Sequence, residues 1–115
     1  MTPTDLVQRQ LDAYNAHDLD AYAACFAEDV RVYRMPDPAP AMSGRDALRA
    51  YYAEHRFTIP GLRAELRGRI AMGAVVIDHE WVHGLGDTPM EVAAVYRVVG
   101  TAAGSAIGEV HFFYP

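Results

Sequence analysis

Residues 11–33 constrain the fold more than any other stretch of the chain, because they pass from helix to turn, to a second helix and to a strand with almost no connecting residues. Asn15-Ala16-His17-Asp18 breaks the first helical pattern, and Asp18 is a residue type that caps helices well. The alternation around Val30 and Val32 then predicts a first strand. Few folds accommodate two nearly contiguous helices that lead directly into a strand.

The chain begins with a segment that is typical of a helix start. Thr2 is a predicted N-cap, Pro3 suits the first helical position, and Asp5 lies where an acidic side chain meets the positive end of the helix dipole. At 100° per residue, Gln10 lies within the same apolar stripe as Tyr14. The Gln10 amide is therefore expected to face the interior. In the second helix, Leu19, Tyr22, Ala23 and Phe26 are expected to share one face.

A third helix is predicted after a proline-rich loop. Residues 35–40 contain three prolines, which lack the amide that a strand ladder needs. Ser43, with Asp46 three residues later, resembles a capping box, and the helical period continues to His55. Ile59-Pro60-Gly61 then ends the helix.

The rest of the chain is β-rich. From Leu62 to Met72, every second residue is apolar, and the intervening Arg63, Glu65, Arg67 and Arg69 predict a solvated strand face. Three more strands are predicted at 74–83, 90–99 and 105–113, and short turns make neighbouring strands antiparallel. We therefore expect one α+β domain over residues 1–115, with three N-terminal helices packed on one face of a curved, mainly antiparallel sheet.

Charge and cysteine content narrow the classes of partner. Ten basic residues against fifteen acidic ones give a net charge of −5, which argues against nucleic acid and against an anionic membrane surface. Cys25 is the only cysteine, so no internal disulfide can form. There is no apolar run of the ~20 residues that a membrane span needs, and no export signal. A reducing cytoplasm is the expected location.

Three motifs carry a resemblance to a known family: Tyr-Asn-Ala-His-Asp-Leu-Asp-Ala at 14–21, Phe-Ala-Glu-Asp-Val at 26–30 and Ser-Gly-Arg-Asp-Ala-Leu at 43–48. The chain resembles the nuclear transport factor 2-like superfamily, in its SnoaL-like and ketosteroid-isomerase-like branch. The resemblance implies a cone that encloses a mostly apolar pocket for a small organic molecule, homodimers through the outer sheet face, and often no cofactor. The family contains isomerases, cyclases, hydrolases, dehydratases and non-enzymatic binders, so it does not imply one reaction.

Alignment with ketosteroid isomerases tests whether this chain keeps the residues that catalyse steroid isomerisation. By resemblance, the general base falls on Arg34, with Asp37 close by in the loop, the oxyanion-binding tyrosine on Gln10, and the protonated aspartate on Ala94. Only the supporting tyrosine is kept, as Tyr52. Proton abstraction beside a carbonyl needs a base and donors to the enolate oxygen, so steroid isomerisation is not predicted.

His79-Glu80-Trp81-Val82-His83 spells the HExxH signature of zinc proteases. That motif places two histidines on one zinc only when it is helical. The flanking Val75, Val76 and Ile77 favour a strand, on which residues four apart are separated by ~13 Å. No metal site is therefore predicted.

Either face of the strand predicted at 74–83 could be the buried one. Alternation alone would bury Val75, Ile77 and Trp81, whereas the resemblance turns them outward to a partner subunit. In the family register the inward residues are Val76, Asp78, Glu80, Val82, Val92, Ala94, Tyr96, Glu109, His111 and Phe113. Convergence of these strands predicts an acidic pocket.

The candidate catalytic residues are His111, Glu109 and Asp78, since a histidine beside carboxylates can transfer protons. Asp78 and Glu109, together with Arg34, match by residue type the limonene epoxide hydrolases, relatives that use two carboxylates and an arginine. The alternative is a set of salt-bridged wall residues. The candidate ligand-pocket residues are Gln10, Tyr14, Arg34, Tyr52, Glu80, Tyr96 and Phe113.

The sequence leaves three alternative functions open. The first is a proton-transfer enzyme acting as an isomerase, cyclase, dehydratase or hydrolase, and the second is a non-enzymatic small-ligand binder. The third is recognition of a protein through an exposed sheet face that contains Val75, Trp81, Val95 and Phe112.

Overall fold

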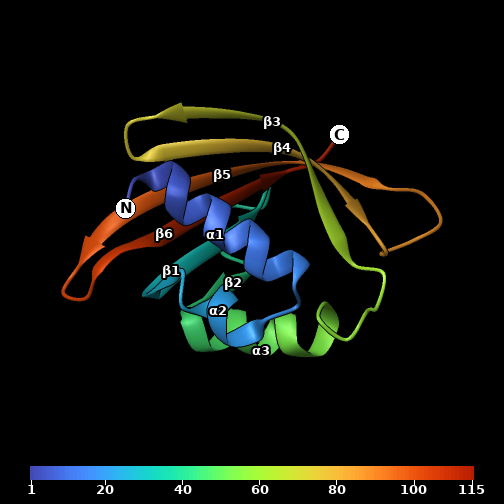
Figure 1. Cartoon of the computed structure of the whole chain (residues 1–115), viewed down its shortest axis with the longest axis horizontal. Helices are drawn as coiled ribbons and strands as arrows, with labels where there is room; N and C mark the ends of the chain where they lie inside the picture. Colours follow the sequence, from blue (N-terminus) through green and yellow to red (C-terminus); the bar gives the residue numbers. More distant parts are fainter.

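A six-stranded curved sheet arches over three helices (Figure 1). The computed structural model describes all residues, 1–115. Its elements are α1 (Pro3–Asn15), α2 (Leu19–Ala23), β1 (Phe26–Arg34), β2 (Met42–Ser43), α3 (Arg45–His55), β3 (Arg63–Met72), β4 (Val75–His83), β5 (Met90–Thr101) and β6 (Gly104–Phe113). The predicted α+β class, with helices first and a mainly antiparallel sheet, is confirmed.

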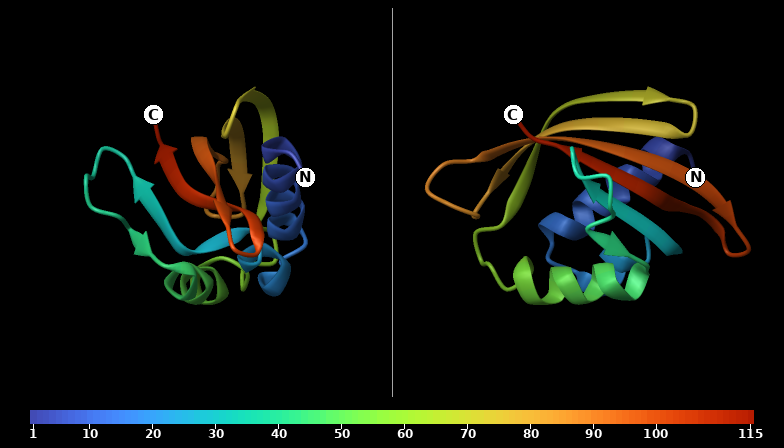
Figure 2. Two further views of the ribbon diagram at one scale, coloured as in Figure 1. Left: turned by 90° about the vertical axis from the view of Figure 1, so that its left-hand side faces the viewer. Right: turned by 180° about the vertical axis from the view of Figure 1, so that it is seen from behind.

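The strand order is β2-β1-β6-β5-β4-β3, and only the β1–β6 pairing is parallel. Figure 2 shows from two further sides that the sheet curls and that α1 and α3 lie on its concave side. Helix α1 contacts β3 and β4, whereas α3 contacts β1 and β2. No helix is long and apolar enough to cross a membrane.

The first two helix starts agree with the sequence, and the third does not. The Thr2 hydroxyl accepts from the Asp5 amide at 3.1 Å, and the Asp5 carboxylate accepts from the Thr2 amide at 3.0 Å. Asp18 caps α2 through the Ala21 amide. The capping box predicted at Ser43 is wrong, because Ser43 belongs to β2, and Gly44, at φ 92°, precedes α3 without a side-chain cap.

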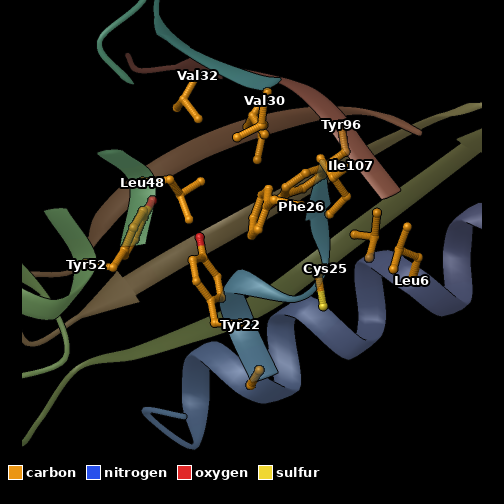
Figure 3. Close-up of a cluster of buried hydrophobic side chains, with 14 of the residues drawn as sticks. Leu6, Tyr22, Cys25, Phe26, Val30, Val32, Leu48, Tyr52, Tyr96 and Ile107 are labelled. Atoms are coloured by element: carbon orange, nitrogen blue, oxygen red, sulfur yellow. The ribbon is translucent and has the colours of Figure 1, made fainter. Parts of the chain in front are cut away.

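The second helix is shorter than predicted. It ends at Ala23, and Phe26 is the first residue of β1 rather than part of a helical stripe. Phe26 pairs with Ile107 of β6 and is 1% exposed. In Figure 3 its ring lies beside Ile107 at the centre of the apolar core that α1 and α2 cover. Pairing with β6 therefore overrides the weak helical period at this position.

A bulge in β3 reverses the faces of that strand. Leu66 pairs with Glu80, but Gly68 pairs with its neighbour His79, so two residues of β3 span one residue of β4. Because side chains alternate, one extra residue moves everything beyond it to the other face. Arg69 therefore points inward, and Ile70 is 62% exposed on the outer face. The predicted solvated position of Arg69 is wrong.

A second bulge lies in β6 at Gly108, because Arg97 pairs with Glu109 while Val98 pairs with Ile107. Ile107 and Val110 are both buried as a result, at 0% and 1% exposure. The residues predicted to face inward, Glu109, His111 and Phe113, lie on the opposite face. That register prediction is wrong, and Phe112, assigned to the outer face, points toward the helices instead.

The inward register of the two central strands is as the family resemblance implied. On β4 and β5 the buried residues are Val76, Asp78, Glu80, Val82, Val92, Ala94 and Tyr96, each at most 6% exposed. Val75, Ile77 and Trp81 lie on the outer face. The concave face therefore carries two acidic side chains within an apolar surface.

Candidate functional site

A cavity lies between the concave face of the sheet and the helices. Sixteen residues line it, twelve of them hydrophobic, and its volume is about 60 Å³. The lining residues are Gln10, Leu11, Tyr14, Tyr22, Arg34, Tyr52, Arg56, Ala64, Glu80, Val82, Leu85, Met90, Val92, Tyr96, Phe112 and Tyr114. A buried water needs roughly 10–15 Å³ of such volume. The cavity is therefore narrow and suits a small molecule.

Most of the predicted pocket residues meet in this cavity. Those that line it are Gln10, Tyr14, Arg34, Tyr52, Glu80 and Tyr96. Phe113 does not, because the β6 bulge gives its place to Phe112. Sequence reasoning missed Arg56, although it follows Tyr52 by four residues and therefore continues the same helix face.

Glu80 is the acidic group of the cavity. Its position on the buried face of β4 leaves it 5% exposed, and none of the hydrogen bonds within the protein involves its carboxyl group. Burial, together with the nearby negative charge of Asp78, raises the pKa of Glu80 to about 8, although Arg69 partly offsets this effect. Glu80 is therefore mainly protonated at pH 7 and can donate a hydrogen bond.

Asp78 lies beside Glu80 on the buried side of β4 but does not line the cavity. Its two carboxylate oxygens accept from Arg69 Nε at 2.7 Å and from Arg69 Nη2 at 2.9 Å. Arg69 also donates to the Gln8 side chain at 2.8 Å, which connects the pair to α1. Asp78 is 0% exposed. The arrangement is a buried, bidentate ion pair behind the pocket wall.

Tyrosine hydroxyls are a second class of polar group at the cavity. Tyr22 and Tyr52 pack with their ring centroids 4.8 Å apart, and Tyr14 contacts both rings. Figure 3 shows Tyr22 and Tyr52 among the aliphatic side chains of the core. Burial raises the pKa of Tyr14, Tyr22, Tyr52 and Tyr96 above the usual value. These hydroxyls therefore remain protonated, although the Tyr22 hydroxyl already donates to that of Tyr52.

The predicted proton-transfer pair lies elsewhere. His111 stacks on Tyr33 on the outer face, with 4.6 Å between ring centroids, and its Nδ1 lies 3.6 Å from Glu109 Oε1. Neither residue lines the cavity. The predicted convergence of His111, Glu109 and Asp78 on one volume is therefore wrong, because the bulge at Gly108 separates them onto two faces.

The HExxH segment is a strand, as predicted. His79 and His83 lie on the outer side of β4, and each faces a different carboxylate. His79 Nε2 lies 2.6 Å from Glu91, and His83 Nε2 lies 2.9 Å from Glu65. Glu80 points to the other side of the sheet. The two histidines and the glutamate are therefore not arranged around a shared position.

The sequence profile of the SnoaL-like domain matches residues 7–106, which is most of the chain. The protein belongs to the SnoaL-like domain family. No curated protein sequence matches the chain significantly. Solved structures with the same fold confirm the nuclear transport factor 2-like architecture that the motifs implied.

Three of these solved structures illustrate the range of the fold. An uncharacterised cystatin-fold protein from Novosphingobium aromaticivorans has a TM-score of 0.82 and 22% identity, covering 97% of both chains. A computationally designed 17-OHP binder has a TM-score of 0.82 and 19% identity, covering 100% of this chain and 95% of its own. A protein from Kribbella flavida, described provisionally as a ketosteroid isomerase, has a TM-score of 0.75 and 21% identity, covering 98% of this chain and 77% of its own. At these identities the likeness concerns the fold.

In this SnoaL-like domain, three positions that the resemblance equates with the ketosteroid isomerase machinery do border the cavity. They are Gln10, Arg34 and Tyr52. The fourth, Ala94, is fully buried and offers no polar group. The site therefore has a distinct set of polar groups, with a protonated glutamate contributed by β4.

Proposed function

We propose that this SnoaL-like domain binds a small, mostly apolar organic molecule and transfers a proton to or from it through Glu80. The observation that carries the proposal is a carboxyl group that borders an aromatic cavity, on a residue only 5% exposed, and has no hydrogen bond within the protein. A general acid or base is most effective when its pKa is near the working pH, and the pKa of Glu80 is about 8. The designed 17-OHP binder supports the small-ligand part of the proposal.

The lining residues have different roles in the proposed reaction. Glu80 in its acid form donates a proton to a carbonyl, hydroxyl or epoxide oxygen, and in its ionised form it removes a proton from carbon. The Tyr14 hydroxyl and the Gln10 amide border the same cavity and supply donors for a developing negative charge. This set suits isomerisation, cyclisation, dehydration or epoxide opening on a small substrate.

Hydrogen exchange tests the proton-transfer step. We expect the wild-type protein to speed deuterium incorporation beside the carbonyl of small ketones such as cyclohexanone in D₂O, measured by NMR. Replacing Glu80 by Gln removes the acid and base but keeps the shape, and is expected to slow the catalysed exchange by about 10²-fold or more. The matched control is His111→Gln, which lies on the outer face and should leave the rate unchanged. Equal rates for wild type and Glu80→Gln would contradict the proposal.

A non-enzymatic binder is the second candidate. The observation that favours it is the absence of any histidine or second carboxylate from the cavity lining, so Glu80 has no acid–base partner there. Under this alternative, small ketones bind in the cavity without any exchange. The D₂O experiment, combined with a binding titration of the same ketones, separates the two functions.

We also propose that two copies of the chain associate through the outer sheet face. The bulge in β3 adds Ile70 and Met72, at 62% and 67% exposure, to the apolar side chains of β4. An apolar strip across three neighbouring strands favours burial against a partner. The strip consists of Ile70, Met72, Val75, Ile77, Trp81 and Val95.

Light scattering tests this association. We expect a dimer for the wild type and a monomer for Ile70→Glu, because the charge would be buried in the interface. Ala50→Glu, on the exposed side of α3, is the matched control and should remain dimeric. A stable wild-type monomer would contradict the dimer and leave the strip free for another protein.

A further inference from the structure

Two arginines border the cavity without a carboxylate partner. Arg34 ends β1 and Arg56 follows α3, and both line the same cavity as Glu80. Both are partly exposed, whereas Glu80 is buried, so they mark the solvent side of the site. The arginines that form ion pairs are Arg49, Arg67 and Arg69. Seven of the ten arginines form no ion pair, and Arg34 and Arg56 are the two of these seven that line the cavity.

Their existing contacts leave most of their donors free. Arg34 hydrogen-bonds the Tyr114 hydroxyl, and Arg56 donates to the His55 carbonyl at 3.0 Å. Each guanidinium carries five N–H donors in a planar fork. Both also lie over the ring of Tyr51, at 5.0 Å and 5.1 Å from its centroid. This shared ring limits the distance between the two guanidinium carbons to about 10 Å.

Stacking on Tyr51 does not account for both arginines. One cation over an aromatic face gains only a small stabilisation at an exposed site. A second cation on the same ring adds a similar amount but also repels the first, and no acidic side chain neutralises the pair. An anion that contacts both groups would offset that repulsion and engage the free donors.

We propose that the ligand of this cavity is an amphipathic carboxylate, whose anionic group is bound by Arg34 and Arg56 while its apolar body extends between the aromatic side chains toward Glu80. A carboxylate is small and planar, and it matches the guanidinium fork. The narrow cavity accepts such a molecule more readily than a bulky one. This inference rests on the proposed function of the pocket and specifies its ligand class.

Matched pairs of acids and amides test the charge requirement. We would titrate the full-length protein with phenylacetate and phenylacetamide, and with hexanoate and hexanamide, by calorimetry. Each pair keeps the same apolar body and changes only the charge. We expect the carboxylates to bind at least about tenfold more tightly than the amides, as for one charge-assisted contact. Raising the salt concentration should weaken the carboxylates alone.

The variants assign the effect to the two arginines. Arg34→Gln/Arg56→Gln is expected to weaken carboxylate binding at least about tenfold and to leave amide binding within about twofold. Arg9→Gln, which removes an exposed positive charge from α1, is the control and should change neither. Thermal unfolding of the double variant verifies that its fold is intact.

The outcomes distinguish this inference from the proposed function. Equal binding of acids and amides, or carboxylate binding that is unchanged in the double variant, would overturn the carboxylate inference and leave the pocket proposal standing. Failure of all four compounds to bind would overturn both. Selective carboxylate binding without any Glu80-dependent exchange would support the ligand class and contradict the proton transfer.

Discussion

Replacing Asp78 by Asn is expected to lower the free energy of unfolding by about 3 kcal/mol, measured by urea denaturation. The substitution preserves the shape of the side chain but removes the charge that faces Arg69. Asp78 is fully buried, and the Arg69 side chain is only 15% exposed, so the unpaired guanidinium cannot reach water freely. Loss of one partner from a buried ion pair typically costs about 3–5 kcal/mol.

Further variants test whether the expected loss of stability comes from the broken ion pair. Arg69→Met leaves Asp78 unpaired and should cost a similar amount, whereas the double variant Asp78→Asn/Arg69→Met should recover much of the loss. The exposed pair Asp20–Arg49 is the matched control, and Asp20→Asn is expected to cost under about 1 kcal/mol. Additive losses in the double variant would show that the ion pair does not act as a unit.

The sequence predicted those parts of the fold that depend on local chemistry. The cap at Thr2 and the cap at Asp18 need only a short side chain near free amides, and both are present. The inward position of Gln10 follows from helical period alone. On β4 and β5 no bulge interrupts the pairing, so the register that the family resemblance implied holds, and Glu80 and Tyr96 face the cavity. Alternation alone would instead have buried Val75, Ile77 and Trp81.

The errors at the site have a common physical cause. Counting every second residue assigns a strand face correctly only until a bulge, and β3 and β6 each contain one. Those bulges moved Arg69 inward and His111 outward, which exchanged the expected members of the site. Gly68 and Gly108 were the available signals, since glycine within a strand often marks a bulge. A side chain at Gly108 would meet the Val99 methyl groups at 2.8 Å.

The pairing of Asp78 with Arg69 could not be inferred from spacing. It depends on the register between β3 and β4, which the bulge shifts by one residue. Without that pair, the two neighbouring acidic residues of β4 look equivalent. The structure makes them different, because Arg69 compensates Asp78 directly, while Glu80 is left in an apolar cavity with a raised pKa.

Glu80 is expected to make the folded state less stable as the pH rises. Its pKa is about 8 in the folded protein and near the ordinary value of 4.5 in the unfolded chain. Between these values the folded state holds a proton that the unfolded state has lost, so the stabilisation is complete below pH 4.5 and is lost as the pH rises toward about 8. The free energy of unfolding falls by at most about 1.4 kcal/mol per pH unit for one proton.

Comparison with Glu80→Gln isolates this effect from the other titrating groups. The amide cannot ionise, so we expect the variant to gain about 2–3 kcal/mol relative to wild type between pH 5 and pH 7, measured by urea denaturation at each pH. Glu28→Gln removes an exposed carboxylate and should show no comparable trend. A constant difference between wild type and Glu80→Gln across this range would mean that Glu80 ionises normally, and it would then lack the protonated state on which the proposed acid chemistry depends.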